Sequence, residues 1–243
     1  TSSVAYSNSK YNYSRDTNSE NELGYSKFDV PHRLMAQLSY TTPKYLNGWT
    51  STTISVIYNG FSGSRYSLTM NEVSDFNGDG QKGNSLLYIP TEAEMDNMNF
   101  VDYTDQKTGK LIMSAADSRK AFTEWVNNDD YAKNHRGQYA ERNSNLSNWE
   151  HEIDLHLAQT IYNAPGLGKL EFTFDIINFA NMLNKKWGAS YSSAYNLSPL
   201  TVVSLSTDEN GNRNPGYAFN NAKINKSDIS SRWHAQVGIR LTF

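Results

Sequence analysis

The sequence predicts an all-β fold, an antiparallel transmembrane β-barrel fragment with a long, partly helical extracellular loop. Three observations lead to this prediction: several segments alternate apolar and polar residues, aromatic residues make up 13% of the chain, and the connections between strands differ greatly in length. Alternation with a period of two is the pattern of a strand whose faces meet different environments. In a barrel, these environments are lipid outside and a polar lumen inside.

Composition excludes several classes of protein. The 243 residues carry a formal net charge of −3, so the basic excess on which nucleic-acid binding depends is lacking. The chain has no cysteine, which removes thiolate metal sites, thiol nucleophiles and disulfides. It has no run of 18 apolar residues, which excludes a membrane-spanning helix. Average hydropathy does not exclude strands that cross a membrane, because their lipid-facing and lumen-facing residues alternate.

The last segment shows the alternation most clearly. From residue 232 to Phe243, apolar residues occupy every second position and the chain ends on the aromatic one. This length of about a dozen residues fits a tilted membrane-spanning strand, which needs roughly 9–11. Similar strands are predicted at residues 34–40, 54–59, 149–162 and 170–176, with the tail of a sixth around Val4 and Tyr6.

The connections between these strands fall into two kinds. Those at about 41–48 and 163–168 are short, whereas the extracellular loop at about 71–148 and the segment 182–229 are long. Strand direction, counted back from the C-terminus, places both short turns at the same end of the sheet as Phe243. Outer-membrane barrels have this asymmetry, with short periplasmic turns and long extracellular loops. Because six strands are too few to close such a barrel, we expect the chain to be a fragment that lacks N-terminal strands and a signal peptide.

Several short motifs occur in a fixed order along the chain. Together they resemble the C-terminal barrel of TonB-dependent outer-membrane receptors, in particular the Oar-like group of Bacteroidota. The residues that carry the resemblance are Phe28–Arg33, Asp75–Gly80, Leu87–Pro90, Arg136–Asn143, Phe174–Phe179, Asn181–Lys185 and Val237–Phe243.

This resemblance implies a 22-stranded barrel in the cell outer membrane, plugged by an N-terminal domain, that imports a ligand with energy delivered by TonB. Residues 1–243 would supply strands 17 to 22, with the plug domain absent from the sequence. The implied partners are outer-membrane lipid, the barrel-insertion machinery, and TonB through the absent plug. By the same analogy, the insertion machinery reads the terminal aromatic Phe243. The chain would be a transporter and not an enzyme, and no nucleic-acid partner is expected.

A possible calcium site is predicted in the long loop. Asp75, Asn77 and Asp79 stand at positions 1, 3 and 5 of a calcium-loop pattern, with Gly80 at position 6. The pattern is incomplete, because position 12 is Leu86 and cannot supply a carboxylate. The alternative is an Asn/Gly-rich turn that is held by its own hydrogen bonds.

A helix is predicted over residues 114–127. Its apolar residues recur at spacings of three and four, and Ser114 can cap it ahead of Asp117. We expect Phe122 and Trp125 to give the long loop a small core of its own.

Ligand contact is predicted for Arg136, Gln138, Glu141 and Arg142, together with the calcium-loop residues, because exterior loops meet a ligand first. The sequence leaves the ligand open among peptide, protein, glycan, siderophore and cobalamin. Two alternatives to this function remain. One is a SusC-type glycan importer with a surface lipoprotein as its lid, and the other is a surface adhesin or structural β-sandwich without transport.

Charged and aromatic residues of the strands have simple structural interpretations. Glu152, Asp154 and His156 share one strand face and His151 lies on the other, so the first three are expected to line a polar lumen as cross-strand charge pairs. Aromatic residues near strand ends are expected to form interfacial girdles; they are Tyr45, Trp49, Trp149, Tyr162, Trp187 and Trp233.

Overall fold

The computed structural model describes residues 12–16, 23–72, 75–78, 80–105, 107–164, 166, 168–191 and 195–243. These residues form two compact units, each assembled from separate stretches of the chain. The strand unit comprises the described residues of 30–63, 147–192 and 224–243. The mixed unit comprises 64–146 and 195–223, with the described residues that precede position 30.

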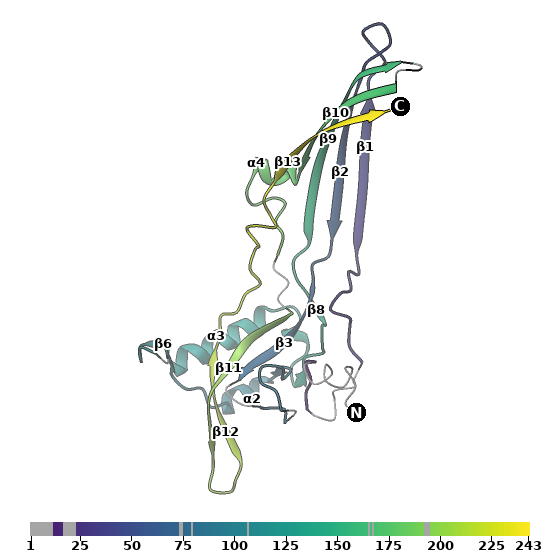
Figure 1. The fold of residues 1–243 in the computed structure, drawn as a ribbon. Coiled ribbons are helices and arrows are strands. Elements are labelled where there is room, and N and C mark those ends of the chain that lie inside the picture. Colours follow the sequence, from purple (N-terminus) through teal and green to yellow (C-terminus); the bar gives the residue numbers. More distant parts are fainter. Residues whose placement is uncertain are drawn as a thin grey trace. The chain divides into compact units, whose positions relative to one another are not determined.

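The strand unit contains one antiparallel sheet in the order β1-β2-β9-β10-β13 (Figure 1). This confirms the prediction of a mostly antiparallel β-fold, and five of the six predicted strands are present. The region of Val4 and Tyr6 lies outside the described residues. Within the described chain the sheet is open, with β1 and β13 at its edges. The strands are β1 (Arg33–Thr41), β2 (Ser51–Phe61), β9 (Glu150–Ala164), β10 (Gly168–Ile177) and β13 (His234–Thr242).

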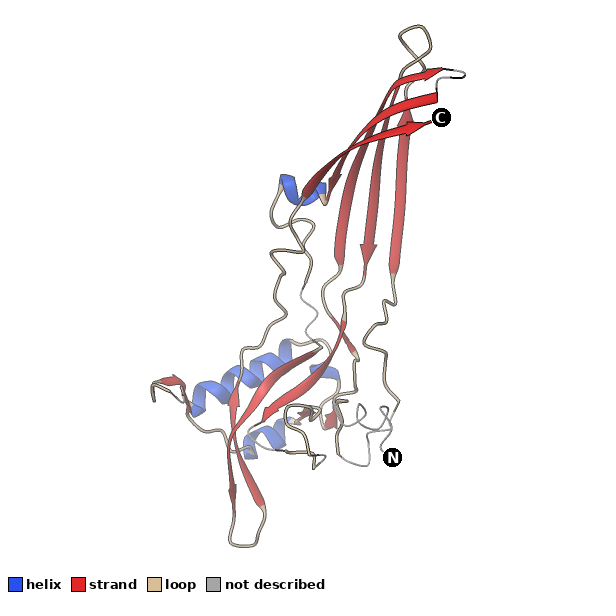
Figure 2. Ribbon diagram, in the orientation of Figure 1, coloured by secondary structure: helices blue, strands red, loops and turns tan. Residues whose placement is uncertain are grey.

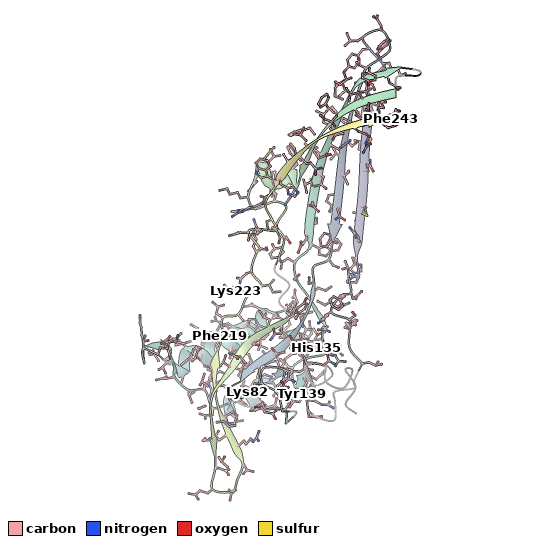
Figure 3. All side chains as sticks on the ribbon, viewed as in Figure 1. Lys82, His135, Tyr139, Phe219, Lys223 and Phe243 are labelled. Atoms are coloured by element: carbon pink, nitrogen blue, oxygen red, sulfur yellow. The ribbon has the colours of Figure 1, made fainter. Side chains whose placement is uncertain are left out.

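The short turns of the strand unit lie at one end of this sheet, as predicted. Thr41 pairs with Thr53 across the first turn, and Gly168 pairs with Ala164 across the second. Thr242 pairs with Lys169, so Phe243 lies at the same end, where Figure 3 labels it. At the other end, the chain leaves the sheet after β2 and later re-enters it at β9.

The registers of the five strands align apolar residues on one face of the sheet and polar residues on the other. A row of apolar residues crosses the whole sheet through Tyr40, Ile54, Leu157, Phe174 and Val237. The neighbouring row on the opposite face crosses it through Ser39, Ser55, His156, Asp175 and Gln236. The alternation seen in each strand is therefore aligned over the whole sheet, and we call its two sides the apolar face and the polar face.

Side chains of the apolar face are largely uncovered. Leu38 is 75% exposed and Val237 is 72% exposed. Among the described residues of the strand unit, the buried apolar side chains are those of Ala158 and Ala180 alone. The sheet consequently lacks a hydrophobic core of its own.

The mixed unit has a second sheet, in the order β12-β11-β3-β8, in which β11 and β3 run parallel. Segments 71–148 and 182–229 were predicted to be long connections with a single helix. This prediction is wrong in part, because the two segments contain strands and further helices and form most of the mixed unit. Its sheet strands are β3 (Arg65–Glu72), β8 (Asn145–Leu146), β11 (Asn196–Thr207) and β12 (Arg213–Phe219). Two small ladders pair β4 (Tyr88–Ile89) with β7 (Gln138–Tyr139) and β5 (Tyr103–Thr104) with β6 (Leu111–Met113).

The longest helix packs against β11 and β12 of the mixed unit, and a short helix packs against β9 of the strand unit (Figure 2). The predicted helix is α3 (Ala115–Asn128), and the Ser114 hydroxyl accepts the N–H of Asp117 at 3.1 Å as expected. Phe122 is fully buried and stacks on Trp125. The structure adds α2 (Glu92–Asn97), the 3-10 turn η1 (Ala132–Asn134) and, in the strand unit, α4 (Phe179–Leu183). No helix in the described part of the chain is both long and apolar enough to span a membrane.

Candidate functional site

A cleft of about 710 Å³ lies on the mixed unit beside the β4–β7 ladder. The ladder pairs Tyr88 with Tyr139 and Ile89 with Gln138, and the Ala140 N–H donates to the Leu87 carbonyl at 2.8 Å. This pairing fixes the residues that follow β7 along one wall. The cleft, which includes Tyr139 of Figure 3, is lined by Tyr13, Arg15, Leu23, Leu86, Tyr88, Gly137, Gln138, Tyr139, Ala140, Glu141 and Arg142.

Three of the four predicted ligand-contact residues, Gln138, Glu141 and Arg142, line this cleft. The fourth, Arg136, makes contacts within the protein. Its guanidinium donates to the Pro90 carbonyl at 3.2 Å and to Asn127 Oδ1 at 2.5 Å. Arg136 thus joins the chain after β4 to the end of α3. Ligand contact by all four residues stays a prediction.

Tyrosines of the cleft were not anticipated from the sequence. The rings of Tyr88 and Tyr139 meet edge to face at 5.1 Å, and Tyr139 is 43% exposed. The Tyr88 hydroxyl donates to Glu94 Oε1 at 2.8 Å, which raises the pKa of the phenol. Backbone donation from Thr91 is the main reason that the pKa of Glu94 is lowered. Tyr88 is therefore a neutral phenol fixed in position by the first turn of α2.

Other contacts hold the floor of this cleft in place. The Glu141 N–H donates to the Tyr131 hydroxyl oxygen at 2.9 Å, and the Tyr131 ring stacks on His135 at 3.9 Å. The cleft therefore brings together tyrosine rings with the amide of Gln138, the carboxylate of Glu141 and the guanidinium of Arg142. Such a combination suits reversible binding of a polar organic ligand through stacking and hydrogen bonds. Among the residues that the structure describes, no group of three His, Asp or Glu side chains is placed to hold a metal.

The predicted calcium loop is described except for Asp79, which lies outside the described residues. Asp75 Oδ1 accepts the Gly78 N–H at 2.7 Å, and Oδ2 accepts the Gly80 N–H at 2.8 Å. Asn77 donates to the Ser14 hydroxyl at 3.0 Å. The two bonds to Asp75 are those of a self-supported turn, the alternative interpretation of the motif, whereas the bond of Asn77 ties the loop to the segment at Ser14. Calcium binding stays a prediction, and it would have to use the remaining lone pairs of the Asp75 carboxylate.

Charged residues of the strand unit follow the predicted division between faces. His151 pairs with Gly60 in the apolar-face register, and His156 pairs with Ser55 on the polar face. His156 is hydrogen-bonded to Asp175 of the neighbouring strand. Glu171 contacts Lys169, and its Oε1 lies 3.8 Å from Arg240 of β13. His156 and Arg240 thus contact acids on the neighbouring strand, whereas the contact between Lys169 and Glu171 lies within β10. Asp154 Oδ1 accepts the backbone N–H of Asn178 at 2.8 Å.

Aromatic residues lie beyond the strands at both ends of the sheet. Tyr45 and Trp49 belong to the short turn between β1 and β2, and Trp149 directly precedes β9. Near the short turns the apolar face carries two polar residues that pair in register, Thr52 and Gln159. Gln159 Oε1 accepts hydrogen bonds from Tyr45 at 3.1 Å and from Thr52 at 2.7 Å.

Comparison with known proteins gives no family assignment: no protein-family model matches the chain, and no curated protein or solved structure is significantly similar to it.

Proposed function

We propose that the strand unit is part of the wall of an outer-membrane β-barrel, and that the protein takes up a ligand by TonB-dependent active transport. The observation that supports this proposal is the continuous, uncovered apolar face of the five-stranded sheet, backed by a polar face on its other side. The mixed unit would then provide ligand contacts on the extracellular side.

The size of the apolar face argues that it needs a non-aqueous environment. Removing a large apolar side chain from water contributes about 1.5–3 kcal/mol when it is fully buried. Roughly ten such partly exposed side chains would contribute on the order of 10 kcal/mol, which is comparable to the whole net stability of a domain. They are Leu34, Leu38, Tyr40, Ile54, Val56, Leu157, Phe172, Phe174, Val237, Ile239 and Leu241.

The aromatic residues favour lipid over a protein partner. Trp149 and Tyr162, which bracket most of β9, are thirteen positions apart. At about 3.3 Å per residue they are about 43 Å apart along the strand, or about 33 Å along the membrane normal for a tilt of about 40°. Aromatic girdles flank an apolar band about 25 Å tall in outer-membrane barrels, so this spacing supports a position for each ring near an interface.

The polar face and the cleft fit the same proposal. A lumen or a plug accommodates the hydrogen-bonded residues His156 and Asp175 and the ion pair of Glu171 with Lys169, which lipid would not. The cleft at Gln138 and Tyr139 lies on the unit built from the connections between strands. Energy coupling to TonB rests on the motif resemblance stated above.

Membrane placement is tested by fractionation and labelling. We expect the protein to need detergent for extraction, and a cysteine introduced at Gln138 to react with a membrane-impermeant maleimide in intact cells. A cysteine at Thr242 should react only after the outer membrane is permeabilised. Residues 1–243 contain no cysteine, so each introduced cysteine is the single labelling site within them. Extraction by salt alone would contradict the proposal and favour a surface adhesin or a structural sandwich.

Transport is tested by comparing a strain that lacks this protein with a strain that lacks TonB. Both are grown with peptides, glycans, iron chelates or cobalamin as the limiting nutrient. We expect a shared growth defect on one of these compounds. Normal growth of the first strain on every compound for which the second strain fails would contradict transport.

A further inference from the structure

A second cleft, of about 600 Å³, lies on the strand unit at the end of the sheet away from Phe243. We call it the basic cleft. It forms where α4 and the residues after it meet the segment that leads into β13. Its lining residues are Asn181, Met182, Lys185, Lys226, Asp228, Ser231, Arg232 and Trp233.

Hydrogen bonds shape the basic cleft before any ligand arrives. The Asn181 carboxamide donates to the Trp187 carbonyl at 2.8 Å and to the Lys185 carbonyl at 3.3 Å. The Lys226 ammonium donates to the same Lys185 carbonyl. On the other side, the Ser231 hydroxyl oxygen accepts the Ser190 N–H at 2.9 Å.

Positive charge dominates the lining. Lys185, Lys226 and Arg232 face a single acid, Asp228, so the lining has a net charge of +2 in a chain whose total is −3. All three basic residues are exposed. Guanidinium and ammonium groups gathered in this way suit a phosphate, to which arginine can donate two parallel hydrogen bonds.

The basic cleft is continuous with apolar surface. Trp233 lines the cleft and begins the row of β13 residues that continues through Val237 and Leu241 on the apolar face. Leu183 and Ile229, close in sequence to the lining residues, are 61% and 80% exposed. A free phosphate would use the charges but leave this apolar surface uncovered.

We infer that the basic cleft binds the phosphorylated headgroup of a lipid whose acyl chains lie along the apolar row of β13. This inference rests on the proposed membrane location. Tryptophan and basic residues together at the edge of an apolar surface are the combination that selects anionic lipid at an interface. The lipid would belong to the leaflet on the side away from Phe243.

The test measures lipid retained by the complete protein to which these residues belong, after reconstitution in nanodiscs that contain phosphatidylcholine with a minor fraction of phosphatidylglycerol or lipid A. Native mass spectrometry counts the bound lipids. We expect enrichment of the phosphorylated lipid, and a decrease of about tenfold or more in the variant Lys185→Gln/Lys226→Gln/Arg232→Gln. The control variant Lys107→Gln/Lys110→Gln/Lys120→Gln changes the charge equally on the mixed unit and should retain the lipid.

Each other result has a distinct meaning. Equal retention of both lipid classes by the original protein, or unchanged enrichment in the first variant, would overturn the inference while leaving membrane insertion intact. Displacement of the lipid by millimolar inorganic phosphate alone would also overturn it in favour of a free anion. Failure of the protein to enter nanodiscs would overturn the proposed function itself. A Lys185→Arg/Lys226→Arg variant, which keeps the charge, should bind like the original and separates charge loss from misfolding.

Discussion

At the scale of single residues, the close approach of Asn178 to Gly188 shapes the segment after β10. Asn178 has a positive φ of 55°, and its carboxamide donates to the carbonyls of Gly188 and Ser231 at 2.8 and 2.9 Å. Its Oδ1 is buried without a hydrogen-bond partner among the described residues. A Cβ on Gly188 would lie 1.8 Å from this Oδ1, so glycine is required there.

We therefore expect Gly188→Ala to destabilise the strand unit by about 2–3 kcal/mol, because it adds a steric clash to the strain of a positive φ. The matched control is Gly48→Ala, which has a positive φ of 81° but no atom within 4 Å of the added Cβ. The control should cost about 1 kcal/mol. Unfolding in denaturant measures both, and an equal cost for the two variants would show that the Asn178 contact does not matter.

Tyr66 gives the mixed unit a pH dependence. Burial, with a smaller contribution from the charge of Asp129, raises the pKa of its phenol to about 12. Its unfolded value is about 10, so its contribution to stability is complete below pH 10 and is lost as the pH rises from 10 to 12. We expect a loss on the order of 2 kcal/mol over this window.

The measurement is denaturant unfolding at pH 9 and pH 11.5 for the original protein and for Tyr66→Phe. The variant should lose less stability over the window, by about the amount assigned to Tyr66. An identical loss in both proteins would contradict the assignment.

At the scale of elements, the sequence predicted the strands that have one apolar and one polar face. It missed strands such as β11, in which residues of both faces are buried. β13 shows a clean alternation because its two faces meet different surroundings. In β11, by contrast, consecutive residues from Pro199 to Val202 are all buried, so no period of two exists to be seen. β12 contains Pro215 and Gly216, which favour a turn when considered locally.

The candidate site was predictable only in part for a related reason. The motifs Leu87–Pro90 and Arg136–Asn143 were both recognised, but their pairing as β4 and β7 depends on contacts between residues about fifty positions apart. Without that pairing, the sequence does not indicate that the rings of Tyr88 and Tyr139 are in contact. A signal for α2 was present in Thr91 and Glu94, which form a complete capping box.

The two faces of β13 allow a matched test at this scale. We expect Val237→Lys, on the apolar face near the middle of the strand, to destabilise the membrane-inserted protein by about 2–4 kcal/mol. Gln236→Lys adds the same charge on the polar face beside Asp175 and should be tolerated. The fraction of folded protein in detergent or lipid at increasing urea concentration measures the difference. Equal sensitivity to both changes would mean that the faces do not meet different environments.

At the scale of the whole molecule, the two units differ in how far they bury their large apolar side chains. The mixed unit buries Leu68, Leu87, Phe122 and Val202 almost completely in a core of its own. The strand unit leaves its large apolar residues exposed on one face and carries polar contacts, such as those of Glu171 with Lys169 and Arg240, on the other. Because the mixed unit has a hydrophobic core and the strand unit does not, we expect the exposed apolar face of the strand unit to lie in a non-aqueous environment.

Assembly of such a protein should depend on Phe243. Phe243 is fully exposed at the end of the sheet where the short turns lie. By the resemblance to TonB-dependent receptors, we expect Phe243→Ala to lower the amount of assembled protein in the outer membrane several-fold. Heat-modifiable mobility in gel electrophoresis measures the assembled fraction. Undiminished assembly in this variant would show that the terminal aromatic is not needed.

The proposed contact between the apolar face and lipid is tested directly by scanning positions 235–241 with single cysteines that carry a spin label. In reconstituted membranes, we predict that accessibility to oxygen, which partitions into lipid, is high at 235, 237, 239 and 241. Accessibility to a water-soluble nickel complex should be higher at 236, 238 and 240. A profile without this period of two, or one in which both sets of positions are equally open to water, would contradict the lipid-facing sheet on which the proposed function depends.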